Sequence, residues 1–268
     1  MAIMAAETLG IDYDQVRPIV ADTASVGYAH LTGGSRVTFA TGMAVVDSTK
    51  KIIQELCIRA AKMWNVDPDG VVWEDGCAKP ASSNVGDFAP LSIREIAAKR
   101  AQTGGPIVAA AAVNPGGVAP GFATQFCDVE VDPETGKVTV LRFVAAQDVG
   151  RAIHPSYVEG QIQGGVTQGI GWALNEEYIY DAKGHMENPG FLDYRIPVAS
   201  DLPMIEPVLV EVPNPAHPYG AKGAAEVNIC PPMAAIANAV ARATGQRLTE
   251  LPMSPPKVLA AIDGQKRT

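Results

Sequence analysis

The segment Phe126-Cys-Asp-Val-Glu-Val131, Asp132-Pro-Glu-Thr-Gly136, Lys137-Val-Thr-Val-Leu-Arg-Phe-Val144 decides the fold of this chain. Apolar and polar residues alternate on both sides of the central five residues, which is typical of strands that bury one face. The proline and glycine of residues 132–136 favour a turn. The segment therefore predicts a β-hairpin, and Glu206-Pro-Val-Leu-Val-Glu-Val212 predicts a further strand.

Helices are predicted on both sides of the hairpin. The stretch from Lys50 to Met63 has the apolar pattern of an amphipathic helix, with Asp47 or Ser48 as its N-cap, and we expect it to pack against a sheet. Ser92-Ile-Arg-Glu95 fits a capping box that opens a helix through about Arg100. Further helices are expected over residues 1–11, 158–174 and 233–243.

The first half of the chain has weaker strand signals and ends in turn-forming residues. Val16-Arg-Pro-Ile-Val20 predicts a short β run, and Gly70-Val-Val-Trp-Glu-Asp-Gly76 predicts a strand ended by a turn. The Gly104-Gly-Pro106 and Asn114–Gly121 stretches predict a boundary nearby. The fold class is therefore α+β, with two α/β subdomains of mixed sheets faced by helices, residues 1–118 and 119–268.

Composition excludes two classes of partner. The chain has 268 residues, a formal net charge of -8 and a pI near 5.0, and it lacks the clustered Lys and Arg that a nucleic-acid binder needs. It also lacks the run of roughly 18 to 20 apolar residues that crosses a bilayer. Because its start has no basic and apolar secretory signal, we expect a cytoplasmic protein without membrane contact.

The four cysteines do not predict a metal centre. They lie at positions 57, 77, 127 and 230, without a CxxC pair or a nearby histidine cluster. This spacing favours neither a zinc site nor an iron-sulfur site. We expect buried, unreactive thiols, including Cys230.

The segment Gly220-Ala-Lys-Gly-Ala-Ala-Glu226 places a carboxylate at the end of a glycine-rich turn. Pro231, Pro232 and an apolar run follow, so the turn precedes a helix. Glycine allows a ligand to approach the backbone, and helix N-termini favour anionic groups. The site suits a catalytic base, although a Glu here could also only cap the helix.

Two other glycine-rich segments supply the context: Gly160-Gln-Ile-Gln-Gly-Gly-Val-Thr-Gln-Gly-Ile-Gly171, preceded by Asp148–Pro155, and Gly33-Gly-Ser-Arg-Val-Thr-Phe-Ala-Thr-Gly42. In this order and spacing, the three segments resemble the C-terminal part of the molybdopterin-binding subunit of the xanthine dehydrogenase and aldehyde oxidase family of molybdenum hydroxylases. The resemblance covers nearly the whole chain, including Asn188–Pro197 and Leu251–Leu259.

The resemblance implies that Glu226 is the catalytic base, and that no side chain ligates the molybdenum, which the pterin dithiolene holds. It matches Gln168 to a glutamine that hydrogen-bonds the pterin. Ala225 departs from the family pattern, where glycine is more usual, which puts the rate or the substrate range in doubt.

The remaining cofactor residues follow from the same resemblance. Phe39–Val45 matches a loop that passes beneath the pterin, where small residues leave room and amides can donate to anionic oxygens. Arg36 is a candidate for pairing with a cofactor phosphate, and a surface ion pair is the alternative. The predicted cofactor-binding residues, apart from Gln168, are Arg36, Ala40, Thr41, Gly42, Met43, Ala44, Val45, Lys222 and Gly223. Asp148 and Arg151 are predicted to be structural.

The implied cofactor is molybdenum-molybdopterin, including its cytosine dinucleotide form. Upstream family segments that clasp the cofactor are not in this sequence, so we expect a gene split or a fragment, and an obligate hetero-oligomer. The expected partners are a second molybdopterin-binding chain, an iron-sulfur subunit and a flavin (FAD) subunit. The substrate would be a small molecule.

The implied activity is hydroxylation, with water-derived oxygen, of an electron-poor carbon of an N-heterocycle, purine or aldehyde. An aromatic acyl-CoA reductase of the same family is one alternative. A non-catalytic assembly subunit is another, although the presence of Glu226 and Gln168 counts against it.

Overall fold

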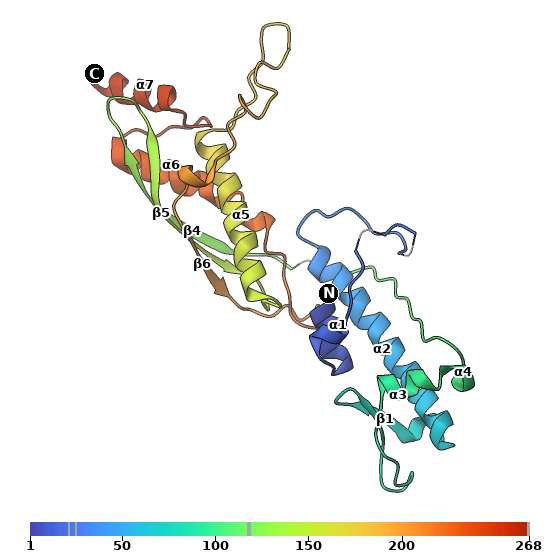
Figure 1. Ribbon diagram of the computed structural model, residues 1–268. Helices are drawn as coiled ribbons and strands as arrows, with labels where there is room; N and C mark the ends of the chain where they lie inside the picture. Colours follow the sequence, from blue (N-terminus) through green and yellow to red (C-terminus); the bar gives the residue numbers. More distant parts are fainter. Residues whose placement is uncertain (21, 25, 117–118, 267–268) are drawn as a thin grey trace. The chain divides into compact units, whose positions relative to one another are not determined.

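The computed structural model describes residues 1–20, 22–24, 26–116 and 119–266. The chain divides into two compact units, Met1–Gly117 and Val118–Thr268 (Figure 1). Each unit has its own sheet and its own cluster of buried apolar side chains. The fold is of the predicted class, α+β.

The first unit places one long helix against a small antiparallel sheet. The sheet has the order β1-β2-β3, and Leu56 and Ala60 of the long helix pack with Val71, Ala78 and Ile96. The predicted contact between this helix and a sheet is confirmed. The elements of the unit are α1 (Ala2–Leu9), η1 (Tyr13–Gln15), α2 (Val37–Trp64), η2 (Pro68–Gly70), β1 (Val71–Glu74), β2 (Cys77–Pro80), β3 (Leu91–Ser92), α3 (Ile93–Ala98) and α4 (Arg100–Thr103).

The start predicted for the long helix is wrong. Helix α2 begins at Val37 rather than near Lys50, so Asp47 and Ser48 lie inside it and do not cap it. Phe39–Val45, predicted as a loop, is therefore helical. One glycine among small and apolar residues costs a helix only about 1 kcal/mol, which packing on neighbouring elements overcomes.

Two smaller expectations also need correction. Val16–Val20 forms no strand: Pro18 lacks an amide donor, and Ile19 and Val20 are 68% and 83% exposed. The sheet of the first unit is purely antiparallel, and only that of the second is mixed. The capping box is confirmed, since the Ser92 hydroxyl accepts from the Glu95 amide while the Glu95 carboxylate accepts from the Ser92 amide.

The second unit contains the predicted hairpin. β4 and β5 pair in antiparallel register, and β5 pairs with β6 in parallel, giving the order β4-β5-β6. The predicted helices on either side of β6 are also present. The elements are β4 (Ala123–Val131), β5 (Val138–Asp148), α5 (Pro155–Leu174), η3 (Ala199–Asp201), β6 (Ile205–Val210), η4 (Glu226–Asn228), α6 (Pro231–Thr244) and α7 (Pro255–Lys266).

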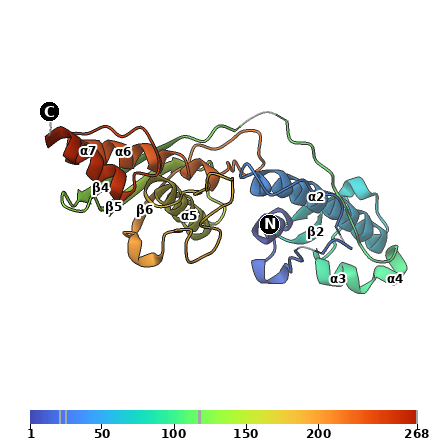
Figure 2. The same cartoon turned by 90° about the horizontal axis from the view of Figure 1, so that it is seen from above.

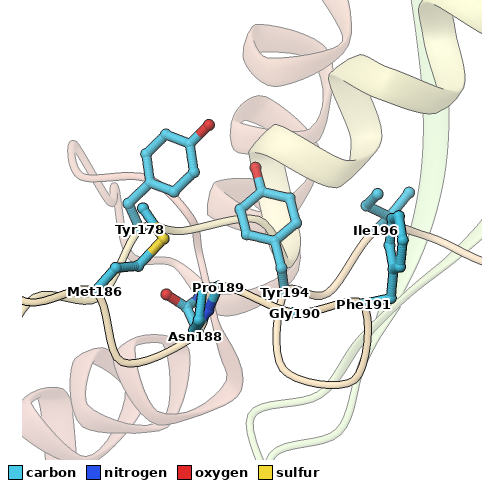
Figure 3. A pocket seen from close by; sticks show the side chains of 8 residues that line it. All are labelled: Tyr178, Met186, Asn188, Pro189, Gly190, Phe191, Tyr194 and Ile196. Carbon is cyan, nitrogen blue, oxygen red and sulfur yellow. The ribbon is translucent and has the colours of Figure 1, made fainter.

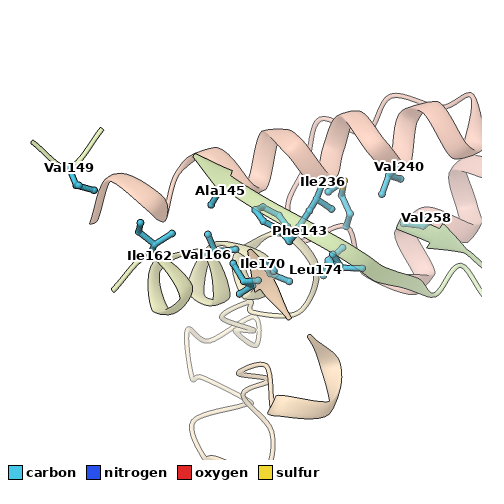
Figure 4. Close-up of a cluster of buried hydrophobic side chains, with 14 residues drawn as sticks. Phe143, Ala145, Val149, Ile162, Val166, Ile170, Leu174, Ile236, Val240 and Val258 are labelled. Carbon is cyan, nitrogen blue, oxygen red and sulfur yellow. The ribbon is translucent and has the colours of Figure 1, made fainter. Parts of the chain in front are cut away.

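Helices cover one face of this sheet. Phe143 and Ala145 of β5 are fully buried against Ile162 and Val166 of α5 and Ile236 of α6 (Figure 4). Val240 of α6 and Val258 of α7 belong to the same buried cluster, and Figure 2 shows both helices in this unit. The opposite face of the sheet is exposed, because the alternate residues of the strands point away from the helices.

The glycine pattern of α5 permits a close contact with the segment that precedes α6. A Cβ atom at Gly165 would lie 2.7 Å from the Ala225 carbonyl oxygen and 2.9 Å from the Asn228 Cβ. A Cβ at Gly169 would lie 2.6 Å from Pro232. Only glycine fits at these two positions, so α5 provides the wall against which residues 225–232 pack.

We expect Gly165→Ala to destabilise the protein by roughly 1–3 kcal/mol, because the added methyl group overlaps a main-chain carbonyl. Gly164→Ala is the matched control: apart from its own helix backbone and chain neighbours, its Cβ would meet none of the residues that the structure describes within 4 Å, and alanine favours helix by about 0.5–1 kcal/mol. Thermal unfolding should separate the two variants. Equal midpoints would contradict the packing described here.

Candidate active site

The carboxylate of Glu226 lies on a bend that links β6 to α6. We call residues 220–229 the Glu226 bend. It starts at Gly220, whose φ of 75° favours glycine, and continues through a bridge between Ala221 and Gly150. It ends in η4, where the Ile229 amide donates to the Glu226 carbonyl at 3.1 Å. The Glu226 residue itself is exposed, on a segment that is otherwise mostly half-buried or buried.

The alanine before Glu226 fits its position without strain. Ala225 has φ and ψ of -77° and -64°, within the right-handed helical region. A side chain at this position therefore requires no positive φ. Alanine in place of the glycine of the family pattern therefore does not strain the backbone of the bend.

An ion pair ties the first half of the bend to the sheet. The Lys222 ammonium lies 2.6 Å from Asp148 Oδ2, and the two side chains are only 10% and 9% exposed. Asp148 Oδ1 accepts from the Gly150 amide at 2.9 Å and from the Val212 amide at 3.3 Å. Asp148 thereby joins the ends of β5 and β6 to the bend, consistent with its predicted structural role.

The pKa of Asp148 reflects these contacts. Burial alone would raise the pKa of this carboxyl group, but the Lys222 ammonium and the two amides outweigh burial and lower it. The main-chain amide of Lys222 also donates, to the Val149 carbonyl at 3.1 Å. Lys222 thus holds the bend, while its contact with a cofactor, like that of Gly223, stays a prediction.

Buried side-chain amides hold the second half of the bend. Gln147 of β5 and Asn228 of η4 are both 0% exposed. Gln147 Nε2 donates to the Gly223 carbonyl at 3.3 Å, and Asn228 Nδ2 donates to the Ala224 carbonyl at 2.8 Å. Asn228 also donates to Gln147 Oε1 and accepts from Gln125 Nε2. The sequence analysis missed these residues, because nothing in a strand pattern shows which polar residues turn inward together.

Gln168 lies on α5, the helix that packs against the Glu226 bend. It is exposed on α5, three residues after Gly165 and one before Gly169, both of which contact the segment that carries Glu226. Residues three apart are neighbours on a helix surface. Gln168 is thus an exposed neighbour of Gly165 and Gly169 on α5, and its contact with the pterin stays a prediction.

The other predicted cofactor residues belong to the first unit. Arg36 is the half-buried N-cap residue of α2, a helix of 28 residues with no acidic residue in its first turn. The predicted alternative for Arg36 does not occur: among the residues that the structure describes, it forms no ion pair. A helix N-terminus and a guanidinium together favour a phosphate.

The amide donors predicted at Ala40, Thr41 and Gly42 are not available, which corrects that part of the prediction. The Ala40 amide donates to the Arg36 carbonyl at 2.8 Å, and the following amides donate within α2, as they do in any helix beyond its first turn. Ala40 and Gly42 are buried, Met43, Ala44 and Val45 are half-buried, and Thr41 is exposed. Their contact with the cofactor stays a prediction, and it would involve side chains rather than amides.

These observations fit an anionic pterin cofactor. Arg36 at the start of α2 suits its phosphate, and the exposed Gln168 amide can donate to or accept from a pterin. In the described part of the chain, no group of three or more His, Cys, Asp or Glu side chains could hold a metal ion. The thiol of Cys230, expected to be buried, is exposed at the N-cap of α6, and the other three cysteines are half-buried.

A separate hollow of about 440 Å³ lies in the segment that follows α5 (Figure 3). The Tyr178 and Tyr194 rings lie 5.5 Å apart there and point to the same side. Tyr194 donates to Glu176 at 2.9 Å, and burial together with that carboxylate raises the pKa of Tyr194 to about 12. None of the predicted site residues lines this hollow.

No helix among the described residues is long and apolar enough to span a membrane.

The Asp148–Lys222 pair should make stability depend on acid pH. Because the pKa of Asp148 is lowered in the folded state, its contribution is present above the ordinary value of about 3.9 and is lost as pH falls through the lowered value. Asp148→Asn should destabilise the protein by about 3–5 kcal/mol at neutral pH, and the difference should shrink below about pH 4.

Unfolding measured against pH checks this prediction. Glu206→Gln is the matched control, since it breaks an ion pair with Arg142 whose side chains are 48% and 59% exposed. It should cost less than about 1 kcal/mol. If the free energy of unfolding differed between wild type and Asp148→Asn by the same amount at every pH, the lowered pKa of Asp148 would be contradicted.

Comparison with known proteins shows the family. The sequence profile of the molybdopterin cofactor-binding domain matches residues 1–203. The chain is 33% identical over 265 residues to the xanthine dehydrogenase molybdenum-binding subunit of Escherichia coli O157:H7, covering 95% of this chain and 34% of that protein. It is 33% identical over 285 residues to the nicotine 6-hydroxylase large subunit of Paenarthrobacter nicotinovorans, covering 98% and 33%.

Solved structures of related enzymes support the same family. Carbon monoxide dehydrogenase from Oligotropha carboxidovorans matches with a TM-score of 0.86 at 26% identity, over 99% of this chain and 34% of that one. Quinoline 2-oxidoreductase from Pseudomonas putida 86 matches with a TM-score of 0.84 at 28% identity, over 98% and 34%. The chain spans about a third of the length of these relatives. It belongs to the molybdopterin-binding family of the molybdenum hydroxylases, which is the family that the glycine-rich motifs predicted.

Proposed function

We propose that this chain forms the C-terminal part of the molybdopterin-binding subunit of a hydroxylase, with Glu226 as the catalytic base. The reaction would add water-derived oxygen to an electron-poor carbon of a small molecule. The observation that carries the proposal is the Glu226 bend itself: an exposed carboxylate on a backbone that an ion pair, buried amides and α5 hold from several sides.

Each unit carries residues of its own that the proposal assigns to the cofactor. When bound, molybdenum-molybdopterin supplies the acceptor for the two electrons of the oxidation and activates the water-derived oxygen. Arg36 and the first turn of α2 would hold the anionic phosphate, and Gln168 would hydrogen-bond the pterin. Ala40 and Gly42 of α2, which are small, would leave room for a bound group near Arg36.

Glu226 would act by accepting a proton. One of its carboxylate oxygens takes the proton that is released as the water-derived oxygen attacks the substrate carbon. A general base must lie within hydrogen-bond reach of that proton, about 2.6–3.2 Å, in every turnover. A side chain with three rotatable bonds meets this requirement only if its backbone is fixed, and the bend provides that.

The names of the relatives favour an N-heterocyclic substrate. Three of them are named for xanthine, nicotine and quinoline, which are all nitrogen heterocycles whose ring carbons are electron-poor. The related aldehyde oxidoreductases and carbon monoxide dehydrogenase show that the same fold serves other molecules. We therefore propose a substrate of the N-heterocycle, purine or aldehyde class.

Partner chains would complete the enzyme. Several relatives are named as subunits, and this chain spans about a third of their length. We propose a second molybdopterin-binding chain that encloses the rest of the cofactor, an iron-sulfur subunit and an FAD subunit that carry electrons away. The cytosine dinucleotide form of the cofactor fits the same proposal.

Glu226→Gln tests the proposed base. The amide keeps the shape of the side chain but cannot accept the proton, so kcat should fall by about 100-fold or more in the assembled enzyme while molybdenum content stays unchanged. Steady-state turnover and metal analysis measure both quantities.

The matched control is Glu130→Gln, which removes the same charge from an exposed position on β4. Glu130 lies five residues along β4 from Gln125, or about 16 Å at the rise of a strand. The control should keep wild-type turnover. Full activity in Glu226→Gln would instead favour a non-catalytic assembly subunit or another base.

A further inference from the structure

We propose that Gln147 and Asn228, supported by Gln125, are positioning residues that fix the main chain on both sides of Glu226. Their three side-chain amides form a chain of hydrogen bonds in which each amide donates to the next. The chain starts at Gln125 on the sheet and ends at the main-chain carbonyl groups just before Glu226. This inference rests on the proposed function, because it assigns the three residues a role in the reaction of Glu226.

The location of these amides is unusual. Gln147 and Asn228 are completely buried, and Gln125 extends from the same face of the sheet, since Gln147 pairs with Ala123 two residues earlier on β4. A buried amide without partners costs about 1–3 kcal/mol. Apolar residues of similar size would fill the same space without that cost. The hydrogen bonds that these amides make, rather than their packing alone, therefore explain why amides occupy these buried positions.

The two backbone carbonyls determine the orientation of the whole chain. A carbonyl oxygen can only accept, so Gln147 must present its NH2 group to Gly223 and Asn228 must present its NH2 group to Ala224. Gln147 Oε1 then accepts from Asn228. Asn228 Oδ1 is left to accept from Gln125 Nε2, at 3.1 Å. None of the three amides can be reversed without placing two acceptors, or two donors, against each other.

The amide chain brackets Glu226 in the sequence. Gly223 and Ala224 lie three and two residues before the carboxylate, and Asn228 lies two residues after it. On the other side of the bend, the Ala225 carbonyl lies where Gly165 of α5 leaves space. The backbone around Glu226 is therefore held between the amides and α5, whereas Glu226 itself is an exposed residue.

The amide chain differs in role from the Asp148–Lys222 pair. The ion pair anchors the bend at Lys222, four residues before Glu226, and joins the ends of two strands. The amides act on the last residues before the base. Loss of the amides should therefore displace the carboxylate while the fold and the cofactor site persist. A displacement of about 1 Å can cost about 100-fold in rate.

Gln147→Met in the assembled enzyme is the direct test. Methionine keeps the length of the side chain but leaves the Gly223 carbonyl without its donor. We expect kcat to fall about 10-fold to 100-fold, KM to change less than about twofold, and molybdenum content to stay at the wild-type level. The separation of kcat from KM identifies positioning, since general destabilisation would lower the amount of active enzyme and its metal together.

Gln163→Met is the matched control. Gln163 on α5 is half-buried and donates to the Ile205 carbonyl at 3.3 Å, the same kind and length of bond as that of Gln147, but on β6 rather than on the Glu226 bend. This variant should keep the wild-type kcat. Equal kcat losses in Gln147→Met and Gln163→Met would overturn the inference, as would an unchanged kcat in Gln147→Met.

Gln125→Met decides the question if Gln147→Met does not assemble. Gln125 is only half-buried and donates to Asn228 rather than to a carbonyl of the bend, so its loss should lower kcat by a smaller factor, about 3-fold to 10-fold, with KM unchanged. No loss of kcat in this variant would then refute the chain of amides. Glu226→Gln separates the two proposals: if it is inactive while Gln147→Met and Gln125→Met are fully active, only the positioning role fails.

Discussion

The second unit depends on one constraint, which is the close contact between a helix rich in glycine and the bend that carries Glu226. Side chains at Gly165 or Gly169 would overlap the main chain of residues 225–232, so these positions of α5 have none. The opposite side of the bend rests on the buried amides of Gln147 and Asn228. A carboxylate that must reach a reacting atom reproducibly needs such support on both sides, because its own side chain is flexible.

The proposed function distributes its tasks between different elements of the fold. The sheet supplies the fixed groups, Asp148 and Gln147, at the end of β5. The bend supplies the reactive carboxylate, and α5 supplies both the wall and the exposed Gln168. In the first unit, the start of α2 combines Arg36 with a helix dipole, as an anionic cofactor requires. Each unit thus carries proposed cofactor residues of its own.

Sequence reasoning succeeded where local chemistry decides the structure. The hairpin around residues 132–136, the capping box at Ser92 and the prolines that open α6 were all predicted, because each depends on neighbouring residues only. It failed at the start of α2, where packing makes Phe39–Val45 helical despite a glycine. It could not find Gln147 or Asn228 either, because strands β4 and β5 and the bend bring these amides together only in the folded chain.

The central claim is that the Glu226 carboxylate faces a molybdenum-pterin cofactor that this chain helps to bind. The most direct measurement is an experimental structure of the assembled, cofactor-loaded protein. We predict that a Glu226 carboxylate oxygen lies within hydrogen-bond reach of the ligand sphere of the metal, at about 3 Å or through one water molecule, with the Gln147–Gly223 and Asn228–Ala224 bonds intact. A Glu226 side chain directed away from the cofactor, or a cofactor bound elsewhere, would contradict the account.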